Sequence, residues 1–99
     1  MWVKVAKVGD FDKVDSQLIE YGGLSIALFK AGGRFYAMDG LCPHQGGPLA
    51  EGYVEGAEVI CPWHAWSFDL KTGFCTSVPG VTQKVYALKT QDADVWIDV

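Results

Sequence analysis

Four residues in two short segments of this chain have the types and spacing of metal ligands. Cys42 and His44 lie in the first segment, and Cys61 and His64 lie in the second. Written as spacing, the pattern is C-x-H, sixteen residues, then C-x-x-H. Each segment offers one thiolate and one imidazole. Two such pairs are what a [2Fe–2S] centre of mixed ligation requires, with one iron bound by two cysteines and the other by two histidines.

Zinc is the alternative metal for the same side chains, because two cysteines and two histidines also bind zinc tetrahedrally. Zinc modules favour C-x₂₋₄-C spacing, with ligands paired by type. This chain instead mixes ligand types within each segment, and 49% of its residues are hydrophobic, enough for a substantial core. The pattern favours iron–sulfur and leaves a structural zinc-binding interaction module as an alternative of another class.

The elements that must position these ligands are short β-strands. Glycines are spread along the chain, and Gly22-Gly23 joins two strand-like runs as a two-residue hairpin turn would. Residues 12–17 offer at most one helical turn. The pattern is typical of an all-β sandwich or small barrel. The predicted strands cover residues 3–8, 18–21, 24–30, 34–38, 53–54, 58–60, 66–69, 74–77, 84–88 and 95–99.

Composition narrows the possible partners. The formal net charge is −4 and the sequence has no basic stripe, so we expect no binding to nucleic acid. No apolar run approaches the roughly 20 residues needed to cross a bilayer, and the first residues lack the regions of a signal peptide. The odd count of three cysteines argues against a disulfide framework. We therefore expect a cytoplasmic protein without a membrane partner.

The two ligand segments resemble those of the Rieske iron–sulfur family, and the resemblance covers nearly the whole chain. It implies an antiparallel β-sandwich that forms a single domain over residues 1–99, with a small cluster-binding β subdomain at about 40–80. It also implies a third, proline-containing loop that covers the cluster, and Val78-Pro79-Gly80 stands where that loop is expected. The resemblance implies one [2Fe–2S] cluster per chain, bound by Cys42, His44, Cys61 and His64.

The chain departs from the high-potential branch of that family. The extra cysteines that form a disulfide there are matched here by Gly47 and Trp63, so the bridge is impossible. The hydroxyls that donate hydrogen bonds toward the cluster are matched by Trp66 and Phe68. With fewer donors, the negative charge of the reduced cluster is less compensated. The resemblance therefore predicts a potential at the low end of the Rieske range of about −150 to +300 mV.

The resemblance implies an electron-transfer component rather than an enzyme. An oxygenase subunit needs a second iron with two histidine ligands, and both histidines of this chain are already assigned to the cluster. We expect a carrier of one electron from a reductase to the terminal oxygenase of a dioxygenase system. The alternative is the Rieske small subunit of an assimilatory nitrite reductase, bound to its catalytic subunit.

Residues near the ligands are assigned to docking or packing. Gln45, Trp63 and Pro79 are expected to form the docking surface around the histidine-bound iron, with core packing as an equal alternative for Trp63. Cys75 is expected to be a small buried hydrophobe.

Overall fold

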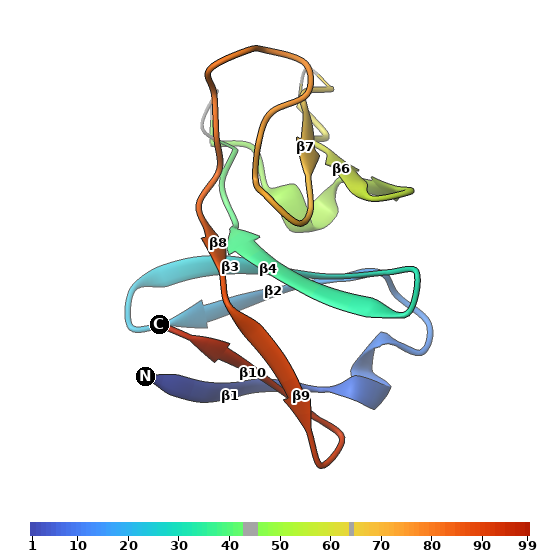
Figure 1. The fold of residues 1–99 in the computed structure, drawn as a ribbon, viewed down its shortest axis with the longest axis vertical. Coiled ribbons are helices and arrows are strands. Elements are labelled where there is room, and N and C mark those ends of the chain that lie inside the picture. Colours follow the sequence, from blue (N-terminus) through green and yellow to red (C-terminus); the bar gives the residue numbers. More distant parts are fainter. Residues whose placement is uncertain (43–45, 64) are drawn as a thin grey trace.

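Three antiparallel sheets make up the part of the chain that the computed structural model describes, residues 1–42, 46–63 and 65–99 (Figure 1). The base sheet has the strand order β1-β10-β9, the middle sheet β2-β3-β4-β8 and the third sheet β5-β6-β7. The elements are β1 (Trp2–Lys7), η1 (Val8–Phe11), β2 (Ser16–Tyr21), β3 (Leu24–Ala31), β4 (Arg34–Asp39), η2 (Leu49–Glu51), β5 (Tyr53–Glu55), β6 (Glu58–Ile60), β7 (Ser67–Asp69), β8 (Val85–Tyr86), β9 (Leu88–Gln91) and β10 (Asp94–Asp98).

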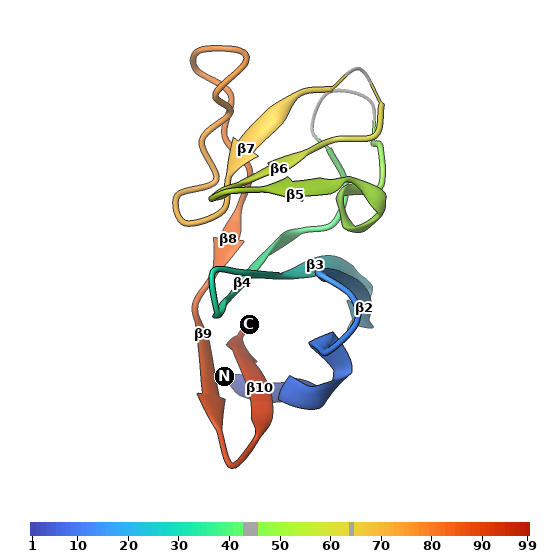
Figure 2. The same cartoon turned by 90° about the vertical axis from the view of Figure 1, so that its right-hand side faces the viewer.

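The middle sheet lies between the other two, with the base sheet on one side and the third sheet on the other (Figure 2). Strand β3 is buried on both faces, which explains its nearly continuous apolar sequence. Because side chains alternate along a strand, Ile26 and Leu28 join the core on the base side. Ala27 and Phe29 join the core on the side of the third sheet. The middle sheet thus separates two cores.

Tight glycine turns set the register of the middle sheet. Gly22 and Gly23 have φ values of 56° and 84°, which a type I′ turn requires of both central residues. This turn pairs Tyr21 with Leu24 at the closed end of the β2–β3 hairpin. The hairpin expected from the sequence is confirmed.

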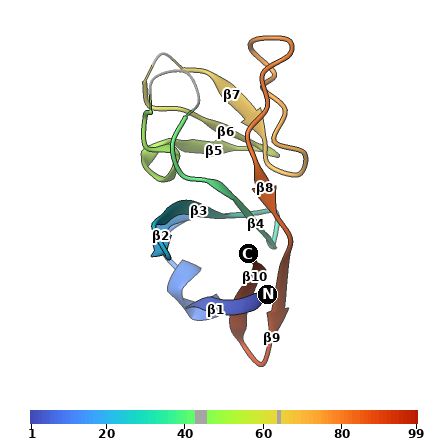
Figure 3. The same ribbon diagram turned by 90° about the vertical axis from the view of Figure 1, so that its left-hand side faces the viewer.

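The chain passes from the middle sheet to the base sheet near Ala87. Residues 84–88 were expected to form one strand, but β8 pairs with β4, and β9 pairs with β10 (Figure 3). The expectation of one strand is wrong because the backbone changes partner between Tyr86 and Leu88. Strand β9 also runs on to Gln91, so the closing turn lies at residues 92–93.

Two other expected elements differ from the structure. Residues 74–77 form no strand, because Phe74 and Cys75 make single bridges to different segments and no ladder can extend. The helical turn lies at Val8–Phe11 rather than at 12–17. The Asp10 carboxylate accepts the Lys7 N–H at 3.0 Å and so closes the turn earlier in the chain.

Among the described residues, no helix has the length and apolar character needed to cross a membrane. The helical segments found there are the short 3₁₀ turns η1 and η2.

Candidate metal centre

Two loops that leave the sheets bring Cys42 and Cys61 together. The first loop follows β4 and is closed by the Cys42 N–H, which donates to the Gly47 carbonyl at 2.7 Å. The second loop joins β6 to β7 and is closed by the Cys61 N–H, which donates to the Trp66 carbonyl at 2.8 Å. Each cysteine therefore stands at the base of a loop whose ends are held by a backbone hydrogen bond.

Both thiols are buried, free and in contact with each other. Cys42 is 2% exposed and Cys61 is 1% exposed. Burial raises the pKa of the Cys61 thiol, a bond from the Trp63 amide lowers it, and the neighbouring Cys42 raises it again. A bound metal cation reverses this balance, because a coordinating thiol is deprotonated. Two adjacent buried thiols supply the pair of sulfur ligands that one iron of the proposed cluster needs.

A close approach at Gly47 shapes the space around the Cys61 sulfur. A Cβ atom on Gly47 would lie 2.9 Å from the Cys61 Sγ and 3.0 Å from the Trp63 Cγ. Any larger residue would therefore push against the thiol and the indole together. The glycine leaves room beside the sulfur, so the residues present fit a cluster bound at this thiol pair.

The remaining two assigned ligands, His44 and His64, lie outside the described residues, as do Pro43 and Gln45. Within residues 1–42, 46–63 and 65–99, no group of three His, Cys, Asp or Glu side chains comes together.

The third loop packs beside the thiol pair. Val78 and Val81 lie against the core that contains both cysteines. Cys75 is also in this core, 8% exposed, and its sulfur accepts the Val78 N–H at 3.4 Å. The expectation that Cys75 is a buried hydrophobe is confirmed. Pro79 is exposed, as a docking residue would be.

Gln83 is a structural residue of the site that sequence reasoning missed. Its Nε2 donates to the Asp39 carbonyl at 2.8 Å and to the Leu41 carbonyl at 2.6 Å, just before Cys42. The side chain is 6% exposed, which is unusual for glutamine. In the sequence it looks like an ordinary polar loop residue, so no local signal could have identified it.

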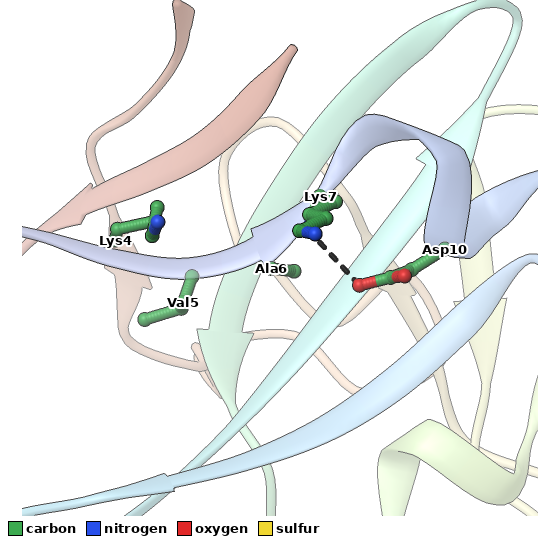
Figure 4. Close-up of a pocket in the computed structure, with 5 residues that line it drawn as sticks. All are labelled: Lys4, Val5, Ala6, Lys7 and Asp10. Atoms are coloured by element: carbon green, nitrogen blue, oxygen red, sulfur yellow. Dashed lines mark hydrogen bonds between the residues drawn. The ribbon is translucent and has the colours of Figure 1, made fainter.

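A surface hollow far from the thiols contains no ligand pair. It lies along β1 and η1 in the base of the molecule, and Lys4, Val5, Ala6, Lys7 and Asp10 line it (Figure 4). The hollow has no thiol, so the chemistry of the chain is assigned to the cysteine loops.

Comparison with known proteins gives one consistent result. The chain is 35% identical to the ferredoxin component of the naphthalene 1,2-dioxygenase system of Pseudomonas putida, over 99% of this chain and 95% of that one. The structure resembles Sphingomonas yanoikuyae B1 ferredoxin, with a TM-score of 0.90, 26% identity and coverage of 100% and 99% of the two chains.

A second solved structure is described as a complex of reduced oxygenase and oxidized ferredoxin in carbazole 1,9a-dioxygenase. It matches with a TM-score of 0.88 and 28% identity, over 97% of this chain and 91% of that one. These matches confirm the antiparallel β fold and the cofactor expected from the sequence, one [2Fe–2S] cluster. The family model for the Rieske [2Fe-2S] domain matches residues 1–91. The chain therefore belongs to the Rieske [2Fe–2S] domain family.

Proposed function

We propose that this chain carries single electrons from a reductase to the terminal oxygenase component of a dioxygenase system. The observation that carries the proposal is the pair of buried, free thiols of Cys42 and Cys61. The fold that brings these two thiols together matches ferredoxin components over nearly its full length. The chain acts as a relay and not as the catalyst. Its place of action is the cytoplasm.

Cys42 and Cys61 bind one iron of the cluster, and His44 and His64 bind the other. The cysteine half is supported by the contact between the two thiols. The histidine half rests on the C-x-H and C-x-x-H spacing alone. When bound, the cluster accepts and releases one electron, while the protein excludes water and sets the potential through hydrogen bonds and burial.

The whole chain, residues 1–99, serves as a single domain, with the cluster-binding subdomain at about 40–80. A core shared by the middle sheet and the cysteine loops supports a single domain. Ala27 and Phe29 of β3 pack in the same core as both cysteines, so the loops are anchored on the middle sheet.

The potential lies near the bottom of the Rieske range, close to about −150 mV. Phe68 is fully buried and its ring has no hydroxyl to donate toward the cluster. Without such donors the reduced state is less stabilised. A redox titration followed by EPR measures this, and a potential well above zero contradicts it.

The first experiment combines iron and acid-labile sulfide analysis with EPR of the dithionite-reduced protein. Two irons and two sulfides per chain are expected for one [2Fe–2S] cluster. Cys61→Ala should abolish the cluster, while the matched variant Cys75→Ala should retain it, because Cys75 lies in the same core without contributing a ligand. Stoichiometric zinc without sulfide would overturn the proposal.

A second experiment tests the carrier role. The reduced protein is mixed with a terminal oxygenase and its aromatic substrate, and reoxidation of the cluster is followed with product formation. We expect one electron delivered per chain. Stable co-purification with a sirohaem subunit instead would favour the nitrite reductase alternative.

His64→Cys adds a negative ligand, so any cluster that this variant holds should be harder to reduce.

A further inference from the structure

The Trp63 side chain reaches from the second cysteine loop to the first. A Cβ built on Gly47 would lie 3.0 Å from Cγ and 3.1 Å from Cδ2 of the Trp63 ring, and 2.9 Å from the Cys61 Sγ. The indole and the sulfur therefore lie against the same side of Gly47. Gly47 itself is buried, although Trp63 is 48% exposed. The indole thus has one surface in solvent and another on the first loop.

The backbone hydrogen bonds that close the two loops do not join one loop to the other. The bond from Cys42 to Gly47 lies within the first loop, and the bond from Cys61 to Trp66 lies within the second. Trp63 is held near the sulfur by its own backbone, because its amide interacts with the Cys61 thiol. Its ring then makes the contact with Gly47. One residue is therefore fixed to Cys61 through its backbone and to the first loop through its side chain.

We propose that Trp63 is a clamp between the two cysteine loops, a positioning residue that keeps Gly47 against Cys61 and shields the Cys61 sulfur from water. The inference rests on the proposed function, in which that sulfur is a cluster ligand. A large, rigid aromatic side chain suits this task, because it covers much area while losing little conformational freedom. Glycine at position 47 is the other half of the clamp, since a side chain there would displace the indole.

The first test measures how fast the holoprotein loses its cluster in excess chelator, from the decay of its visible absorbance. Trp63→Ala should lose the cluster about tenfold faster, the scale typical when a group supporting a metal ligand is removed. Trp63→Phe should restore most of the lifetime, because a ring still covers Gly47. Tyr53→Ala is the matched control. It removes an aromatic side chain that is 70% exposed on β5 of the third sheet, and it should leave the rate unchanged.

The reduction potential gives a readout that a merely structural effect would not move. Water admitted to the Cys61 side stabilises the more negative, reduced cluster, so Trp63→Ala should raise the potential while Tyr53→Ala leaves it unchanged. EPR of the reduced proteins should show altered g-values for Trp63→Ala only.

A double-mutant cycle tests the contact itself. Gly47→Ala should speed cluster loss in the wild-type background, because the new methyl group pushes on both the indole and the Cys61 sulfur, and only the push on the sulfur remains once the indole is removed. In the Trp63→Ala background the same substitution should have a smaller effect, by about threefold or more. If Gly47→Ala assembles no cluster, the rates of cluster loss of Trp63→Ala, Trp63→Phe and Tyr53→Ala decide whether Trp63 acts as the clamp.

Two results would overturn the clamp. One is a Trp63→Ala protein that loses its cluster no faster than wild type, and the other is a cycle in which the two effects multiply independently. In both cases the wild-type protein still holds its cluster, so the proposed function survives. A wild-type protein with no cluster would overturn both.

Discussion

At the scale of single residues, buried hydrogen bonds hold the backbone that leads into the cysteine loops. Gln83 donates from one amide nitrogen to the carbonyls of Asp39 and Leu41, at 2.8 and 2.6 Å. The backbone N–H of Gln83 donates to the Gly73 carbonyl at 2.7 Å. Gln83 thus ties the end of β4 to the segment that follows β7, and it places Cys42 beside the third loop.

Replacing Gln83 by leucine should lower the free energy of unfolding by about 2 kcal/mol, because two partly buried backbone carbonyls lose the Gln83 donor. Gln17→Leu is the control. No donor among the described residues reaches the buried Oε1 of Gln17, so its loss should cost much less. Urea unfolding of the four proteins, wild type, both single variants and the double variant, measures the difference. Equal losses for the two single variants would contradict the role assigned to Gln83.

A second buried bond predicts a pH dependence. The Tyr86 hydroxyl donates to the Asp39 carboxylate at 2.7 Å. Burial is the largest of three causes that raise the pKa of Tyr86 from 10.0 to about 12. The other two are the hydrogen bond to Asp39 and the negative charge of Asp39. The neutral phenol is therefore favoured in the folded state. Its stabilising effect is fully present below pH 10 and is lost as the pH rises through about 12.

Tyr86→Phe should cost about 1 kcal/mol of stability at neutral pH. The gap between wild type and variant should then close as the pH rises from 10 to 12. The Lys84 ammonium lies 5.0 Å from the centre of the Tyr86 ring. It is present in both proteins, so the difference in unfolding free energy isolates the tyrosine. A gap that stays constant with pH would contradict the assignment.

At the scale of elements, the hairpin turns differ in how well their residues suit the backbone. The β2–β3 turn uses two glycines at positive φ. The β9–β10 turn uses Asp92 at 56° and Ala93 at 66° for the same geometry. Alanine is strained there because its Cβ approaches the following carbonyl oxygen.

Ala93→Gly should therefore raise the free energy of unfolding by about 1 kcal/mol. Gly22→Ala, which places alanine at a φ of 56°, should lower it by a similar amount. Thermal unfolding of both variants checks the pair. A stabilised Gly22→Ala protein would show that positive φ is not the controlling factor.

At the scale of the whole molecule, two cores lie on opposite sides of the middle sheet. The core with Cys42, Cys61 and Cys75 also holds residues of the third sheet, such as Phe68. The other core joins the middle sheet to the base sheet through residues such as Ile97. Cluster binding therefore stabilises one half of the molecule directly, and the base keeps its own apolar contacts.

Removing the cluster should speed amide exchange in β5, β6 and β7 by about tenfold or more, while β1 and β10 keep their protection. Hydrogen–deuterium exchange with mass spectrometry, on holoprotein and on protein stripped by chelator, measures this. Uniform loss of protection in all three sheets would mean that the cores unfold as one unit.

The sequence by itself indicated the cofactor, one [2Fe–2S] cluster, and the class of fold. The spacing of cysteines and histidines is a local pattern, and period-two alternation with glycine turns identifies strands without reference to partners. These predictions hold for the Gly22-Gly23 turn and for the strand predicted at residues 24–30. The assignments of the four ligands, Cys42, His44, Cys61 and His64, stay predictions, and so does the docking surface of Gln45, Trp63 and Pro79.

The tertiary structure decided which segments meet. Residues 74–77 have a strand-like sequence, but Phe74 and Cys75 bridge to different segments, so no strand forms. The hydrogen bonds of Gln83 left no mark in the sequence, because they join residues distant along the chain that lie together only after folding. The resemblance matched Gly47 and Trp63 to two cysteines that pair elsewhere in the family, but only the structure shows the indole against the glycine. A local pattern predicts what a segment can form, whereas long-range packing selects its partners.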